Sequence, residues 1–414
     1  MDPDELPARA LSRAFRRVLA ALTLAVAAAL PGAAVAGTSF IPIPEIVTDP
    51  NEGNTFGLLG VVLFTDEKDE IRYMFAPDAT YNDTKGFYPT LRFFGYPTAT
   101  RRYSVVAGKS TTKDEDYEAE YVDRGLWGGR AFIRAFALHE RDSTERFFGF
   151  GNDSDEDDET NFTGVNTTAI ATPGVWVWTH VNLSYRMRIR RYEVQRGQVD
   201  SLPFVGTPEA PRVARDPDLR DTTVHWAHQV AIAYDTRDEP DIPRKGMLAL
   251  LYTEAADRAL GSSTSFVKFG AEWRNFIPMR PWRNPILALR ALTDYTSGSK
   301  ATPFWERSSL GGRRSLRGFG GDRFIDFNRT VATAELRTRV YQRKLFGVNA
   351  EIEVAPFLEA GQVFKHVTES PIDDLHVTYG VGFRGIVRPQ IVGIVDVGAG
   401  SEGAAIFTGV NYPF

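Results

Sequence analysis

The sequence predicts an all-β protein, a transmembrane antiparallel β-barrel of sixteen strands. Three observations predict this fold: an amino-terminal stretch with the features of an export signal, long segments in which apolar and polar residues alternate, and a final segment that alternates up to a terminal aromatic residue. Only a closed barrel lets strands cross lipid without unpaired backbone edges.

The composition narrows the function classes. The chain has 414 residues, a formal net charge of −5, no Cys and a mean hydropathy of −0.25. The absence of Cys excludes disulfides, thiol nucleophiles and Cys-based metal sites. A mild acidic excess argues against a nucleic-acid binder. The hydropathy value resembles that of a soluble protein, but apolar lipid-facing and polar lumen-facing residues of a barrel cancel in such an average.

The amino terminus resembles a targeting segment. Several Arg residues precede an apolar run at residues 18–30, and A-V-A follows at residues 34–36. This pattern predicts a signal peptide at residues 1–36, removed after Ala36, and export to the bacterial outer membrane. The alternative is an uncleaved anchor, although the run is shorter than the roughly 20 residues that span a bilayer as a helix. Residues 37–53 are then expected to be a short periplasmic segment, and residues 54–414 the barrel domain.

Alternation with a period of two dominates the rest of the chain. Between residues 175 and 190 most odd positions are apolar, whereas Trp, polar and Arg residues occupy the even positions. Such alternation predicts a strand with one apolar and one polar face. Residues 329–341, 349–363 and 376–387 repeat the pattern with charged residues on one face. Long strands with these two faces are typical of a transmembrane barrel.

Sixteen strands follow from this alternation, an even number as in bacterial barrels. They are expected at residues 54–65, 71–82, 86–96, 101–111, 117–124, 129–142, 174–191, 224–237, 246–257, 264–277, 285–296, 329–342, 347–364, 375–387, 390–399 and 404–414. With this count, the acidic stretch 143–173 would lie on the periplasmic side, and whether it is an unusual turn or hides a strand pair stays open. A secreted β-sandwich or propeller is the alternative architecture, but it would need Lys and Arg on the outer faces of very long strands.

The carboxy terminus alternates through Ile406, Thr408 and Val410 to Tyr412 and Phe414. On a last strand, Tyr412 and Phe414 would lie in the interfacial aromatic girdle. The segment resembles the terminal signal by which the bacterial outer-membrane assembly machinery recognises its substrates.

A loop rich in Arg and Gly, at residues 307–323, separates two of the expected strands. As a solvated extracellular loop it would contact the phosphates of lipopolysaccharide, which suit Arg side chains. Its core is also similar to the loop motif of the BamA/TamA superfamily, called the bacterial surface antigen family. The matching residues are Gly311, Gly312, Ser315, Leu316, Arg317, Gly318 and Phe319.

Three strand motifs of the same family follow in the family's order. One is D-x-R-D…P-x-x-G, one is F-x-D-x-G with Glu in place of Asp, and one is G-x-G-x-R. The matching residues are Asp235, Arg237, Asp238 and Gly246, then Phe357, Glu359 and Gly361, then Gly380, Gly382 and Arg384. The resemblance covers residues from about 230 to 414.

The resemblance implies a loop that folds into the lumen, where its Arg meets an acidic residue of the inner wall. Counting by twos puts Glu359 and Glu335 on the inner face, so both are expected partners of Arg317. A half-made ion pair in a confined lumen is costly, so the pair would fix the position of the loop. A purely stabilising plug is the alternative interpretation. Residues 37–53 are too few for a POTRA module, so the chain resembles short members of the family.

The resemblance implies a role in inserting or translocating polypeptides, or lipids, at the outer membrane. The seam of the barrel, between residues 54–65 and 404–414, would open to template client strands. A passive or plugged channel, or a structural surface barrel, is the alternative function. An outer-membrane hydrolase is disfavoured because no His is followed two residues later by Ser. We therefore expect no enzyme, cofactor, metal or nucleic acid. The expected partners are outer-membrane lipid and lipopolysaccharide, the assembly machinery, client polypeptides and a separate periplasmic partner.

Overall fold

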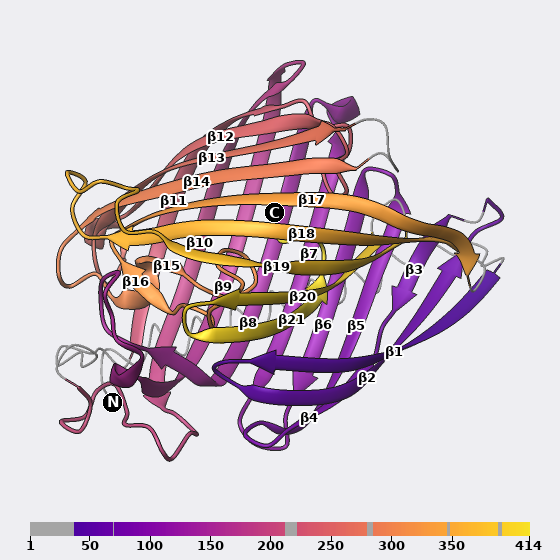
Figure 1. Ribbon diagram of the computed structural model, residues 1–414. Coiled ribbons are helices and arrows are strands. Elements are labelled where there is room, and N and C mark those ends of the chain that lie inside the picture. The colour runs from indigo at the N-terminus through magenta and orange to yellow at the C-terminus, as the bar shows by residue number, and fades with distance from the viewer. Residues whose placement is uncertain (1–36, 69, 212–221, 280–284, 346–347, 388–390) are drawn as a thin grey trace, which may run out of the picture.

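A computed structural model describes residues 37–414 except for residues 69, 212–221, 280–284, 346–347 and 388–390. The predicted signal peptide lies outside the described residues. The described residues form an antiparallel barrel (Figure 1). None of the described residues belongs to a helix long and apolar enough to span a membrane.

One sheet contains 19 strand segments. Segments β3 and β4 both lie between β2 and β5, on either side of a break at Ala76 and Pro77, so the 19 segments fill 18 places in the barrel. The strands of the first half are β1 (Gly37–Asp49), β2 (Gly53–Thr65), β3 (Ile71–Phe75), β4 (Asp78–Asn82), β5 (Gly86–Thr98), β6 (Arg101–Lys109), β7 (Glu115–Leu126), β8 (Ala131–Phe147), β9 (Thr160–Trp178) and β10 (Val181–Arg196).

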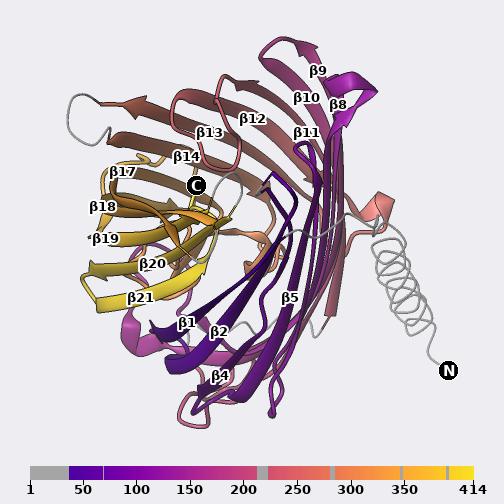
Figure 2. The ribbon, with the colours of Figure 1, turned by 90° about the vertical axis from the view of Figure 1, so that its right-hand side faces the viewer.

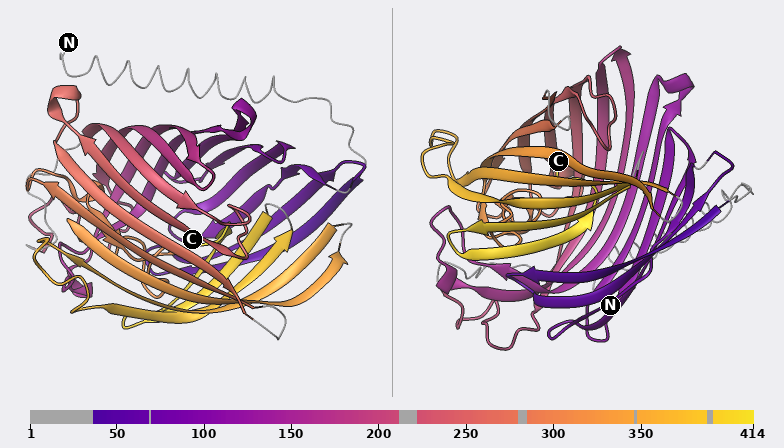
Figure 3. Two further views of the ribbon diagram at one scale, coloured as in Figure 1. Left: turned by 90° about the horizontal axis from the view of Figure 1, so that it is seen from above. Right: turned by 45° about the vertical axis from the view of Figure 1, so that its right-hand side comes forward.

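The second half continues with β11 (Thr222–Asp235), β12 (Gly246–Ala256), β13 (Phe266–Pro278), β14 (Ile286–Gly298), β17 (Asn328–Leu345), β18 (Val348–Phe364), β19 (His376–Val387), β20 (Ile391–Gly400) and β21 (Gly403–Val410). A two-stranded sheet of β15 (Ser308–Leu310) and β16 (Phe324–Asp326) lies in the connection between β14 and β17. Figures 2 and 3 show the sheet curving round until β21 approaches β1.

The alternation of the sequence appears as two faces of the sheet. On β11 the even residues, such as Val230, Ile232 and Tyr234, are exposed on the outside, whereas the odd residues are mostly buried. On β18 the inward residues include Glu353, Phe357 and Glu359, while Leu358 is exposed. An apolar outer face and a polar inner face are what a membrane barrel requires.

The region of β9 and β10 differs most from the sequence-based prediction. The predicted strand at 174–191 is a hairpin, in which Trp178 ends β9 and Val181 begins β10. Beside the two-residue turn the pairing shifts from Trp178–Val181 to Trp176–Asn182, a β-bulge. This shift puts the odd residues of both strands on the same face, so the alternation stays in phase across the turn and resembles a single strand. The prediction also missed most of β9, which begins at Thr160 inside the stretch 143–173.

The amino-terminal segment also differs. Residues 37–53 do not precede the barrel: residues 37–49 form β1, which pairs with β2 along its whole length. Pro42 and Pro44 concealed this strand, because Pro is rare inside sheets. The barrel therefore has 18 places instead of sixteen strands, and its seam joins β1 to β21.

The additional strands change the sidedness of the acidic stretch. Connections such as 257–265 and 299–327 leave one end of the barrel, here called the long-loop end. Connections such as 179–180 leave the other end, here called the short-turn end. Residues 148–159 lie at the long-loop end, where Gly151 bridges to Ile325 and the Arg323 Nη2 donates to the Ser154 carbonyl at 2.8 Å.

Candidate functional site

The central feature of the lumen is Arg317, which the connection between β14 and β17 carries inward. This connection, residues 299–327, is called the lumenal loop. The Arg317 Nε donates to the Glu359 Oε1 at 2.9 Å, and its backbone N–H donates to the Glu359 Oε2 at 2.7 Å. Its Nη1 donates to the Glu335 Oε2 at 2.9 Å. The two carboxylates expected from the sequence thus both meet Arg317, from adjacent strands β18 and β17.

Three further charged residues, which sequence reasoning did not connect to Arg317 as partners, complete a charge cluster. Its members are Arg317, Arg337, Arg384, Glu335, Glu359 and Asp396, each at most 2% exposed. Asp396 on β20 accepts from Arg384 at 2.6 Å and lies 3.3 Å from the Arg317 Nη1. Three cations and three carboxylates leave the cluster formally neutral, which is the condition under which buried charges are tolerated. Arg337, two residues after Glu335, could have been found by the same period-two count.

Glycines of the strand motifs make room for this cluster. A Cβ at Gly382 would lie 2.3 Å from the Arg384 Nη1 and 2.4 Å from the Asp396 Oδ1. A Cβ at Gly380 would lie 2.5 Å from the ring of Phe357, whose face packs 3.5 Å from the Arg317 guanidinium carbon. The G-x-G-x-R motif is therefore a steric requirement of the pocket that receives Arg317. Gly361 similarly faces Leu310 of the lumenal loop.

The loop motif itself is a compact turn with an apolar base. Gly311 has a φ of 120°, which favours glycine, and its N–H and carbonyl both bond the Ser315 hydroxyl. Leu316 and Phe319 are at most 1% exposed and pack with Leu310, Phe324 and other lumenal side chains. Gly312 and Gly318 lie close to neighbouring backbone, Gly318 against β20. The motif residues thus position Arg317.

The lumenal loop is also held on the opposite wall. Arg188 of β10 donates to both Glu306 carboxylate oxygens, at 3.1 and 2.8 Å, and to Glu254 at 2.9 Å. Burial raises the pKa of Glu306, but the charges of Arg188 and Arg190 outweigh it and hold that pKa well below its ordinary range. The loop is therefore attached near Glu306 and near Arg317, and it crosses the lumen between these points.

A second connection enters the lumen from the short-turn end. Residues 236–245, here called the mouth loop, follow β11 and contain part of the D-x-R-D…P-x-x-G motif. Asp235 binds Arg237, Asp238 accepts from the backbone of Arg244, and Gly246 has a φ of 94°. These contacts shape the turn, so the motif residues have a structural role here.

The mouth loop reaches two other walls of the barrel. Asp241 accepts from Arg102 of β6 at 2.7 Å and from Arg124 of β7 at 3.0 Å. Ile242, 1% exposed, packs on Ile386 and its neighbours on β19 and β20. Burial raises the pKa of Asp241, but the hydrogen bond from Arg124 and the charge of Arg102 outweigh it and lower that pKa below 3.8. The mouth loop thus braces the short-turn end of the lumen.

The carboxy-terminal residues do not lie in an outer aromatic girdle. The strand ends at Val410, Asn411 has a φ of 70°, and the last residues turn into the lumen (Figure 1). Tyr412 lies with its ring 3.9 Å from the Arg337 guanidinium carbon, and its hydroxyl donates to Glu353. Phe414 is 7% exposed and packs on Phe276 and the inner face of β14. Arg337 offers both rings a buried cation at cation–π distance, which accounts for their inward position.

The seam between β1 and β21 is short. The two strands share one residue pair, Thr48 with Ile406, whereas β1 and β2 pair from Gly37 to Asp49. Figures 1 and 3 show β1 and β21 meeting near the long-loop end and diverging toward the short-turn end. The hairpin of β1 and β2 is therefore held by the ladders of β2 with β3 and β4 and by side-chain contacts.

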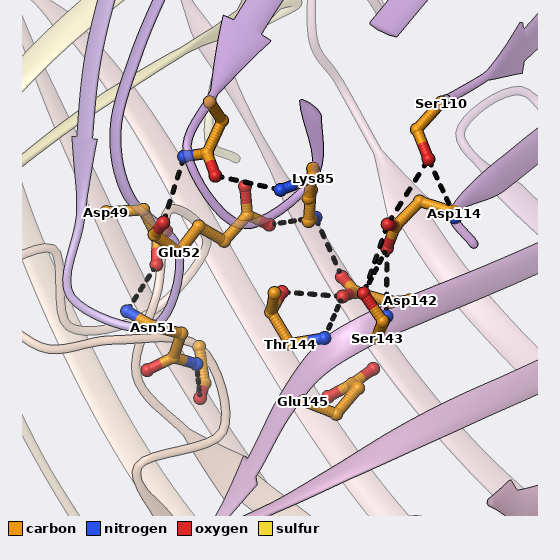
Figure 4. Close-up of polar contacts among 12 residues, drawn as sticks. Asp49, Asn51, Glu52, Lys85, Ser110, Asp114, Asp142, Ser143, Thr144 and Glu145 are labelled. Carbon is orange, nitrogen blue, oxygen red and sulfur yellow. Dashed lines mark hydrogen bonds and ion pairs between the residues drawn. The ribbon is translucent and has the colours of Figure 1, made fainter. Parts of the chain in front are cut away.

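Those contacts gather at the turn of the hairpin (Figure 4). Lys85 donates to Glu52 at 2.6 Å and to Asp142 of β8 at 3.4 Å. Asn51 donates to the Gly321 carbonyl at 3.1 Å and accepts, through its own carbonyl, from Arg146 at 2.6 Å. The turn of the hairpin is thus fixed to β8 and to the lumenal loop, in addition to the ladders that β2 forms with β3 and β4.

Charged and polar side chains line two small cavities in the lumen. One of about 260 Å³ is lined by Lys85, Asp142 and their neighbours, and another of about 210 Å³ by Glu140, Arg190 and residues of the lumenal loop. Within the described part of the chain, no group of three or more His, Asp or Glu side chains is placed to hold a metal ion.

Comparisons with known proteins agree with this architecture. The Omp85 superfamily domain matches residues 99–386. The structure of BamA from Haemophilus ducreyi lacking POTRA domains 1–3 is 12% identical over 90% of this chain and 74% of that chain, with a TM-score of 0.52. A comparison with curated proteins finds no match.

Two structures of CdiB also match, from Acinetobacter baumannii and Escherichia coli. They are 10% and 12% identical over 91% and 92% of this chain, with TM-scores of 0.46 and 0.48. This chain spans 59% and 62% of the length of those two proteins. The family domain covers more than half of the chain, including Arg317 and most of the strands around it, and the chain therefore belongs to the Omp85 superfamily of outer-membrane β-barrels.

Proposed function

We propose that this barrel assists the insertion or translocation of polypeptides, or lipids, at the bacterial outer membrane. The observation that carries the proposal is the seam, which is closed by the single pair of Thr48 and Ile406. Unpaired strand edges are recognition elements for other strands. A seam of this kind gives a client access to the barrel from the membrane, whereas the continuous ladders elsewhere do not.

The lumenal loop gives the barrel a second property that this function needs. Arg317 and Glu306 hold the loop across the lumen, so the resting barrel is obstructed. A transport or insertion device must not leak when no client is present. The proposed role is non-catalytic and needs no cofactor. Export through the signal peptide at residues 1–36 and the partners expected from the sequence, including lipopolysaccharide, the assembly machinery and a separate periplasmic partner, belong to this proposal.

A depletion strain tests the proposal. Loss of the chain should change the outer-membrane proteome, the secreted proteome or the lipid composition of the outer leaflet. Complementation with R317A should restore less function than complementation with R314A, because Arg314 is exposed and its side chain has no ion pair among the described residues. Unchanged proteomes and lipids after depletion would refute the proposal.

A plugged channel is the second candidate, and the filled lumen favours it. The lumenal loop, the mouth loop and the carboxy-terminal residues all occupy the interior. In planar bilayers, a channel function predicts a conductance that increases when residues 311–319 are deleted or Arg317 is replaced. No conductance in any of these forms would exclude it.

A further inference from the structure

The backbone of β1 turns an incomplete edge toward the seam. The Gly60 N–H donates to the Pro77 carbonyl at 2.9 Å, on the side of β2 that faces away from β1. Gly60 pairs with Pro42, so this pair exchanges no hydrogen bonds between β1 and β2. The nitrogen of Pro42 therefore points to the seam, and the period of two gives the same orientation to Pro44, Ile46 and Thr48.

Pro42 and Pro44 have no N–H to offer there. Two successive seam-facing positions of β1 thus lack a donor, and a strand added to this edge could not complete its ladder. The prolines leave the β1–β2 ladder intact, because their nitrogens point away from β2. Pro at an edge is a means by which sheets resist strand addition.

The edge of β21 is different. The Asn411 N–H donates to the Val392 carbonyl at 2.8 Å, toward β20. Alternation then turns Thr408 and Val410 to the seam, each with an N–H. Since Thr48 pairs with Ile406, an extended antiparallel ladder would place Ile46 opposite Thr408 and Pro44 opposite Val410.

At that point the lumenal loop supplies a substitute. The Arg313 Nη1 donates to the Val410 carbonyl at 3.3 Å, which is the acceptor that an N–H at position 44 would serve. Gly409 leaves space for this guanidinium, since a Cβ there would lie 2.7 Å from the Arg313 Nη1. Arg313 forms no ion pair within the described residues. It is therefore free to leave the carbonyl without stranding a carboxylate.

We propose that the seam offers an incoming polypeptide strand a single edge, that of β21 at Thr408 and Val410, and that Arg313 occupies the Val410 carbonyl until an N–H of that strand replaces it. The partner is a β-strand because Thr408 and Val410 expose backbone donors and acceptors at the spacing of a β-strand. Arg313 is four residues from Arg317, so arrival of the strand changes a contact of the lumenal loop. This inference rests on the proposed function only in taking a polypeptide as the client.

Disulfide mapping tests the proposal, and the chain suits it because it contains no Cys. The full chain is placed in phosphatidylcholine vesicles as T408C or I46C, and the probe is a synthetic peptide with the sequence of residues 400–414 and one Cys. The expected result is a cross-linking yield at T408C about tenfold above the yield at I46C. This is the factor expected when one or two more hydrogen bonds form at the edge of β21. Equal cross-linking yields at T408C and I46C would overturn the proposal. A yield no higher than with a scrambled peptide, the result expected if lipid fills the seam, would also overturn it.

Two further variants separate the roles of Arg313 and the prolines. In the T408C background, R313A should increase the yield several-fold, and R314A should leave it unchanged. P42V/P44V restores two donors to β1. A chain that carries both I46C and T408C should then form its internal disulfide faster, and the T408C chain should bind less peptide. The control P89V, within β5, should change neither the rate of disulfide formation nor peptide binding. No effect of R313A and of P42V/P44V in chains that still show the heat-modified mobility of a folded barrel would overturn the proposal. A normal effect in the depletion strain with no peptide binding would show that clients use another route, and would leave the proposed function standing.

Discussion

Replacing Arg317 by Ala should be the most damaging single substitution in the lumen. The change removes side-chain bonds of 2.9 Å to Glu359 and to Glu335, a 3.3 Å contact with Asp396 and a cation–π contact at 3.5 Å with Phe357. The cluster changes from neutral to a net charge of −1 while remaining buried. Leaving one partner of a buried pair uncompensated costs about 3–5 kcal/mol.

The free energy of unfolding in urea, followed by tryptophan fluorescence of the chain in lipid vesicles, measures this loss. R317A should lose about 3–5 kcal/mol, and R317K somewhat less, because Lys keeps the charge but not the fork of donors. The double variant R317A/E359Q should recover about 1 kcal/mol or more relative to the sum of the single variants, since it removes the stranded carboxylate. A loss for R317A within about 0.5 kcal/mol of that for R314A would refute the reasoning.

Three other predictions concern the remaining lumenal contacts. E306Q removes the charge that binds Arg188 and should destabilise the barrel by about 2 kcal/mol in the same urea assay. Conductance should also increase if the loop is displaced. An unchanged free energy of unfolding would mean that this contact does not stabilise the barrel. D241N should increase the conductance of the barrel, because it weakens the contacts that hold the mouth loop at the short-turn end. The pKa of Asp241 is lowered below 3.8, so its contribution is present above pH 3.8 and is lost as pH falls through the lowered pKa. The difference in conductance between D241N and the native chain should therefore be constant from about pH 8 to 5 and shrink only in stronger acid, and a difference that changes near neutrality would contradict this assignment. F414A should cost about 3 kcal/mol, measured by urea unfolding, because the ring packs inside the barrel; a substitution that slows assembly without changing the stability of the folded barrel would instead support an outward signal.

Period-two alternation predicted the class of fold because lipid and lumen impose opposite polarities on successive residues. It could not count the strands. A β-bulge beside the two-residue turn at Thr179 and His180 keeps the alternation in phase, so β9 and β10 merged into one expected strand. Pro42 and Pro44 concealed β1. A Pro is tolerated in a strand only where its nitrogen faces away from the paired strand, and this orientation depends on the tertiary structure.

The candidate site was predictable in part. Local counting on two strands was enough to bring Glu335 and Glu359 to Arg317, since both alternate inward. Asp396 could not be assigned, because its place beside Arg317 depends on the register of β19 and β20. The inward turn of Tyr412 and Phe414 was missed because alternation describes strands, and the chain leaves the strand at Asn411.

Locking the seam tests the central claim, that a client reaches the barrel between β1 and β21. A T48C/I406C disulfide would join the one residue pair that closes the seam, and V381C/V397C would join β19 to β20, which pair continuously. The measurement is the outer-membrane and secreted proteome of the depletion strain complemented with each variant, with and without reductant. The account predicts that T48C/I406C fails to complement until it is reduced, whereas V381C/V397C complements in both conditions. Full complementation by the oxidised T48C/I406C variant would contradict it.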